Sequence, residues 1–139
     1  MGAWGYKIFE NDAAVDFISF FTANPSVKEL RRKIRAASQL AESEYLDSYL
    51  ASEVLAAIKI AISLTRTDDS LPQEFLQTLG QLKTKTNSLE IKEKIFPDAL
   101  AALHRIKTNS ELQELWQETK EYAQWLNEIE KIAKVIEQE

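Results

Sequence analysis

The segment from Asp47 to about Arg66 constrains the fold more than any other part of the chain. Glu53 and Lys59 interrupt an otherwise apolar pattern, and each must reach solvent or find a partner, because an unpaired buried charge is costly. The apolar residues recur at helical spacing and cover more than half of the circumference, namely Leu50, Val54, Ala57, Ile58, Ala61, Ile62 and Leu64. A helix that is apolar on so many sides is predicted to lie in the middle of other helices.

The rest of the chain also predicts helices, because apolar residues recur every three or four positions and cap residues or prolines precede each run. Pro97 lies inside one of these patterns and predicts a break or kink there. The expected helices cover 12–23, 25–40, 47–66, a short stretch after 72, 88–106 with the interruption, and one long C-terminal helix from about 110 to near the end. We therefore predict an all-α fold, a single-domain bundle of five to seven helices over residues 1–139.

Residues 1–10 differ from this pattern. They contain two of the three glycines, Gly2 and Gly5, on either side of Trp4. Glycine permits backbone angles that other residues avoid, so this segment is predicted to be an irregular N-terminal arm that lays its aromatic side chains on the body. We expect the arm to close one end of the bundle.

Composition excludes several classes of partner and chemistry. The chain has no cysteine, so disulfides and thiolate chemistry are excluded and a reducing, cytoplasmic compartment is expected. Its net charge of -5 argues against binding to nucleic acid, because phosphate-binding proteins normally carry a basic face. The longest apolar stretch, 54–64, contains Lys59 and is shorter than the roughly 20 residues that a bilayer requires. The start of the chain indicates neither export nor acylation.

No motif of a standard enzyme class is present. His104 is the only histidine, and it has no cysteine, serine or acidic residue at the spacing of a metal site or a catalytic triad. Phosphate-binding glycine loops, zinc-protease motifs and nucleophile elbows are also absent from the sequence. We therefore predict no catalytic residue, cofactor or bound metal, and we expect no enzyme of a standard class.

Five residues near the arm are candidates either for a binding site or for a structural lock: Trp4, Asn11, Asp12, Asp16 and Glu53. Two interpretations are open. Asp12 and Asp16 are four positions apart on one helix face, and Glu53 joining them across the bundle would create a metal or proton-transfer site. In the structural interpretation Trp4 covers the bundle end, Asn11 caps the first helix, Asp12 compensates its dipole, Asp16 lies on the surface, and Glu53 bonds the arm's backbone.

A second candidate site lies on the last helix. Trp116 and Trp125 are nine residues apart and point to sides about 180° from each other on a continuous helix, so they cannot both face one core. Trp116 fits the apolar stripe. Trp125 is then expected to be partly exposed or covered by a neighbouring element, and together with Tyr122 it forms a candidate protein interface.

The opening Met1-Gly-Ala-Trp-Gly, followed at fixed offsets by Phe9-Glu-Asn-Asp, Ala14 and Asp16, resembles the start of a bacterial family known only as a domain of unknown function. Two later segments are similar to that family as well, the central 51–57 and the final 110–116 with Trp125 after it. Tyr6-Lys-Ile stands where small polar residues and another glycine are frequent in the family. The resemblance covers most of the chain and implies one compact helical domain, but no activity.

These observations lead to three functional hypotheses. The first is a cytoplasmic bacterial interaction protein that binds another protein through an acidic helical surface, with immunity-like or regulatory action. The second is a small-molecule or metal-dependent activity centred on Asp12, Asp16 and Glu53. The third is a homo-oligomeric structural protein. The sequence leaves the oligomeric state and the identity of any partner open.

Overall fold

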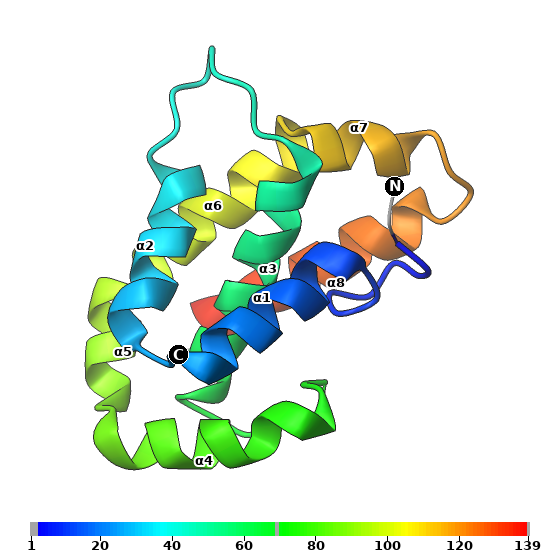
Figure 1. The fold of residues 1–139 in the computed structure, drawn as a ribbon. Helices are drawn as coiled ribbons and strands as arrows, with labels where there is room; N and C mark the ends of the chain where they lie inside the picture. Colours follow the sequence, from blue (N-terminus) through cyan, green and yellow to red (C-terminus); the bar gives the residue numbers. More distant parts are fainter. Residues whose placement is uncertain (1–2, 69, 139) are drawn as a thin grey trace.

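Helix α3 (Ser48–Ser63) runs through the middle of the computed structural model, which describes residues 3–68 and 70–138 (Figure 1). Every α3 residue from Val54 to Ser63 is buried except Lys59. Four helices pack against it, α1 (Asp12–Ala23), α2 (Val27–Ser38), α6 (Phe96–Thr108) and α7 (Glu111–Gln117). The prediction of an apolar central helix is confirmed, and its buried residues join one hydrophobic core.

The remaining elements are η1 (Gln73–Phe75), α4 (Leu76–Lys85), α5 (Ser88–Lys94) and α8 (Tyr122–Glu137). The described residues thus form an all-α fold with eight α-helices, slightly more than the five to seven expected. The break expected at Pro97 is confirmed, because α5 ends at Lys94 and Pro97 lies in the first turn of α6. None of the described helices is long and apolar enough to cross a membrane.

The expectation of one long C-terminal helix is wrong, because α7 and α8 are separate helices joined by a turn over 118–121. Thr119 makes the break. Its backbone N–H and its hydroxyl both donate to Trp116 O, at 2.9 and 2.8 Å, and the hydroxyl also accepts from Glu121 N–H. The five residues 117–121 are all polar, so no apolar side chain in this stretch would favour continuing the helix.

Most helix starts follow the sequence closely. The side chains of Asn11, Ser26 and Asp47 each accept a hydrogen bond from a backbone N–H three residues later. Helix α2 begins at Val27 instead of Pro25, because the Ser26 side chain supplies the N-cap and so fixes the first turn after itself.

The two charges that interrupt α3 both find partners. Glu53 forms an ion pair with Lys33 of α2 at 3.2 Å, and Lys59 forms one with Asp68 at 2.9 Å. Burial by itself would raise the pKa of Asp68, but hydrogen bonds from Ser70 and Lys59 outweigh it and hold the pKa below its ordinary value. The prediction that these charges need partners or solvent is confirmed.

Candidate functional site

The N-terminal arm, described from residue 3 to 10, folds back on itself before α1. Trp4 N–H donates to Glu10 O at 3.0 Å, and Glu10 N–H donates to Lys7 O at 3.1 Å. The Glu10 carboxylate accepts from Lys7 N–H at 3.2 Å and lies against Gly5, where an added Cβ would be 2.6 Å from Glu10 Cδ. Any side chain at position 5 would therefore displace the Glu10 carboxylate.

Asn11 joins the arm to α1. Its Oδ1 accepts from Ala14 N–H at 2.8 Å, which caps the helix, and its Nδ2 donates to Ile8 O at 3.0 Å, which holds the last turn of the arm. The prediction that Asn11 caps the first helix is confirmed. One amide side chain thus fixes both the start of α1 and the direction from which the arm enters it.

Trp4 does not close the end of the bundle, because its side chain is 62% exposed. An isolated antiparallel bridge between Ala3 and Asn11, together with the Trp4–Glu10 bond, sets the start of the arm beside its end. Ala3 packs toward the core, and Trp4 points outward. Ile8, only 6% exposed, is the residue that anchors the arm, and the expected lid role of Trp4 is wrong.

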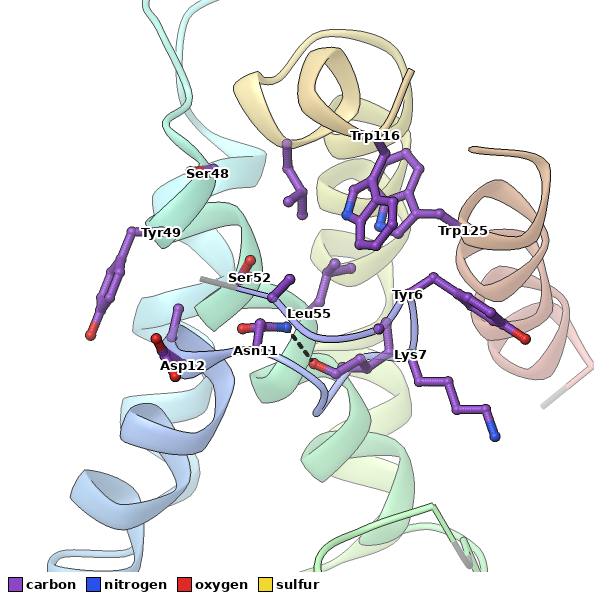
Figure 2. A pocket seen from close by; sticks show the side chains of 15 residues that line it. Tyr6, Lys7, Asn11, Asp12, Ser48, Tyr49, Ser52, Leu55, Trp116 and Trp125 are labelled. Carbon is purple, nitrogen blue, oxygen red and sulfur yellow. Dashed lines mark hydrogen bonds between the residues drawn. The ribbon is translucent and has the colours of Figure 1, made fainter. Parts of the chain in front are cut away.

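A pocket of about 190 Å³ lies beneath the arm (Figure 2). Residues 5–8 of the arm cover it, and Ser52 and Leu55 of α3 form one wall. Trp116 of α7 and Trp125 of α8 form another, and Figure 2 shows both indole rings above the arm with Lys7 extending away from them. The pocket therefore brings together segments that are far apart in the sequence.

Trp125 is only 2% exposed, so the expected interface of Tyr122 and Trp125 is wrong. The angular argument assumed one continuous helix, whereas the turn at 118–121 redirects the chain and lets Trp116 and Trp125 face the same pocket. Tyr122 is partly buried, stacks on Trp125 at 6.2 Å, and accepts a hydrogen bond from Gln113 at its hydroxyl. Its polar end is therefore satisfied inside the protein.

Asp12, Asp16 and Glu53 do not form a metal centre, because no group of three metal-ligating side chains occurs among residues 3–68 and 70–138. Asp12 lies in the first turn of α1 and lines the pocket. Asp16 is exposed and accepts from the Tyr49 hydroxyl at 3.4 Å. Glu53 pairs with Lys33 and not, as expected in the structural interpretation, with the arm.

Two exposed tyrosines, Tyr45 and Tyr49, stand among carboxylates, and Tyr49 also lines the pocket. Partial desolvation and the charges of Asp16, Glu53 and Asp12 raise the pKa of Tyr49. Tyr45 lies just before α3 and is surrounded in the same way, so that desolvation and nearby acidic side chains, Glu111, Glu114 and Asp47, raise its pKa as well. Sequence reasoning missed this arrangement because the two clusters assemble from α1, α3 and α7, which only the fold brings together.

Sequence reasoning also missed the structural role of Arg105. It is 8% exposed and donates to the backbone carbonyls of Leu40 and Ala41 at 3.1 Å each, of Asn109 at 2.7 Å, and of Glu44. These bonds fasten the 39–47 connection, the segment between α2 and α3, to the end of α6. A buried guanidinium that bonds only carbonyls leaves no acidic partner in the sequence to signal it.

The arrangement defines a class: a small all-α protein whose N-terminal arm covers a tryptophan-lined pocket next to an acidic surface. The chain belongs to the family described as Domain of unknown function (DUF4259), whose model matches residues 2–128. The expected membership in a family of unknown function is confirmed. No curated protein and no solved structure matches the chain.

Proposed function

We propose that this protein is a protein-binding module that recognises the basic surface of a partner through an acidic tyrosine surface. This surface consists of seven residues from α1, the end of the 39–47 connection, the first turn of α3, and α7: Asp12, Asp16, Tyr45, Asp47, Tyr49, Glu111 and Glu114. The single observation that carries the proposal is the exposure of the two tyrosines, 63% for Tyr45 and 51% for Tyr49, among these carboxylates.

Tyrosines in this setting suit the recognition of cations. A tyrosine ring offers a large contact area with little loss of side-chain freedom, and its face attracts lysine and arginine side chains. The surrounding carboxylates add to that attraction, and the bond from the Tyr49 hydroxyl to Asp16 helps to hold that ring in place. A partner that presents arginine or lysine would therefore find complementary charge and shape.

The distribution of charge over the rest of the molecule also favours binding of a basic partner at the acidic tyrosine surface. Four basic residues of α2, Lys28, Arg31, Arg32 and Arg35, line a shallow groove on that helix. The surplus of 22 acidic over 17 basic residues is thus not spread evenly. A basic partner would be steered toward the acidic tyrosine surface and away from α2.

Masking the basic surface of an enzyme or toxin is the action that this proposal favours, which corresponds to an immunity-like or regulatory role in the cytoplasm of a bacterial cell. The absence of cysteine from the sequence agrees with a reducing compartment.

The test is affinity purification of the full chain from its native cell, with the wild type compared with a Tyr45→Ala/Tyr49→Ala double variant. We expect a partner with a basic surface that the wild type retains and the double variant loses. With the purified partner, raising the salt concentration from about 50 to about 300 mM should weaken binding roughly tenfold or more, because surface charges are screened.

Leu89→Ala is the matched control, since Leu89 is 57% exposed on α5, outside the acidic tyrosine surface. This variant should retain the partner. A partner that the tyrosine double variant retains equally well, or a monomeric wild type that captures no stable partner, would overturn the proposal. A mass in sedimentation that doubles at low salt would also overturn it, by assigning the surface to the α2 groove of a second copy.

A further inference from the structure

The pocket beneath the arm is lined by the hydroxyl group of a largely buried serine. Ser52 lies on α3, is 6% exposed and lines the pocket. In the described part of the chain its hydroxyl has no hydrogen-bond partner. Other buried serines behave differently, since Ser63 donates to Ile60 O and Ser110 donates to Ile106 O. Among the described residues the fully enclosed side-chain atom without a partner is Ser38 Oγ, so the Ser52 hydroxyl is not sealed off and is available to a molecule in the pocket that it lines.

The two indole rings add further donors to this space. Trp116 and Trp125 are 6% and 2% exposed, both line the pocket, and neither indole N–H is hydrogen-bonded within the described chain. An indole N–H can only donate, and neither of these nitrogens is among the fully enclosed unpaired atoms of the described chain, so both remain available as donors. Ser52 and the two indole rings thus offer the pocket two donors and one hydroxyl that can donate or accept.

We propose that this pocket binds a small uncharged molecule with a single ring and a carbonyl or hydroxyl acceptor. Its volume of 190 Å³ is slightly larger than the cavity of about 150 Å³ that holds benzene, and smaller than the roughly 300 Å³ at which drug-sized pockets begin. The indole rings and Leu55 and Leu112 receive the ring, and Ser52 and the indole N–H groups receive the oxygen.

Charge excludes an anionic ligand from this class. The one basic residue of the pocket lining, Lys7, is exposed and extends away from the indole rings in Figure 2, whereas the Asp12 carboxylate stands at the rim. A carboxylate inside the pocket would lose its hydration without gaining a counter-charge. The proposal goes beyond protein binding, because its central residues, Ser52, Trp116 and Trp125, are buried and lie outside the acidic tyrosine surface.

The test uses benzamide as the probe and follows the three indole N–H signals of the full chain by proton–nitrogen NMR. Trp4, at 62% exposed, serves as the internal control, and its signal is assigned with a Trp4→Phe variant. Benzamide should shift the signals of Trp116 and Trp125 in a saturable way and leave that of Trp4 unchanged. Benzoate, which has the same ring and a negative charge, should bind at least about fivefold more weakly.

Two serine variants sharpen the test. Ser52→Ala should weaken benzamide binding about five- to tenfold, the usual effect of one neutral hydrogen bond. Ser63→Ala makes the same change at another buried position of α3 and should leave the affinity unchanged. Benzamide that leaves both indole signals in place up to its solubility limit, tighter binding of benzoate, or an unaltered affinity of Ser52→Ala would each overturn the proposal.

Discussion

The N-terminal arm and the 39–47 connection are both non-helical, but they are held in opposite ways. The connection projects from the helices at the top of Figure 1, and its residues 41–45 are all exposed. Its base is nevertheless bonded by Arg105, a residue more than sixty positions away in the sequence. The arm lies over a pocket, yet each hydrogen bond of its described part joins residues at most six positions apart.

The difference shows that exposure does not measure how firmly a segment is held. Bonds from Arg105 to the connection exist only while α6 is docked, so the connection should come apart only when the whole bundle unfolds. The bonds of the arm are local, and local bonds can open at a lower free energy than global unfolding. The connection is therefore part of the scaffold, whereas the arm is the segment able to open over the pocket.

Removing Arg105 should have the largest effect. Arg105→Ala deletes the donors to four backbone carbonyls and leaves a space where the buried arginine side chain was. We expect the free energy of unfolding to fall by about 3 to 5 kcal/mol, measured by urea denaturation.

Arg35→Ala is the matched control for that variant. Arg35 is partly exposed and pairs with Asp98 at 3.8 Å, so its loss should cost less than about 1 kcal/mol. If Arg105→Ala costs no more than Arg35→Ala, the 39–47 connection is not held by the guanidinium and the contrast with the arm disappears.

Much of the fold follows from the sequence, because local signals decide where helices begin and which of them is central. The α3 pattern, the caps at Asn11 and Asp47, and the break at Pro97 all depend on residues within a few positions of each other. The same reasoning did not predict the turn at Thr119. The apolar spacing stays in step across it, and the polar run that marks the turn also resembles the solvent side of a helix.

The candidate site was less predictable, because its properties arise between elements. Asn11 was identified since a cap is a local feature, whereas the exposure of Trp4 depends on how the arm folds back on itself at the bridge between Ala3 and Asn11. Ser52 gives no signal in the sequence. A serine in an apolar helix usually satisfies its hydroxyl locally, and only the placement of Trp116 and Trp125 shows that this one faces a pocket.

The second largest expected loss of stability, after that of Arg105→Ala, comes from changing Asn11 at the end of the arm. Asn11→Ala removes the helix cap and the bond to Ile8 O, and should lower the free energy of unfolding by about 1 to 2 kcal/mol. Asn11→Asp is the control, because it keeps the capping oxygen and loses only the donor to the arm. It should leave global stability nearly unchanged and speed hydrogen exchange at the amides of Trp4 and Glu10. Unaltered exchange at both amides would show that the arm is held by something other than Asn11.

The smallest expected effect is a change in how the stability of the protein depends on pH. It concerns Glu111, which bonds Ser48 where the 39–47 connection meets α3. The Glu111 carboxylate accepts from Ser48 N–H at 2.7 Å, and this bond, with a contribution from Tyr45, holds the pKa of Glu111 below its ordinary value. A lowered pKa in the folded state stabilises the protein above the unfolded pKa of about 4.3, and this stabilisation is lost as the pH falls through the folded pKa. The advantage of the wild type over Glu111→Gln in urea denaturation should therefore shrink between about pH 5 and pH 3.

Glu114→Gln, the same substitution one turn along α7 at an exposed position, is the control for the general loss of negative charge. Stability curves of wild type and Glu111→Gln that run parallel over this range would show that the Ser48 bond contributes nothing that depends on ionisation.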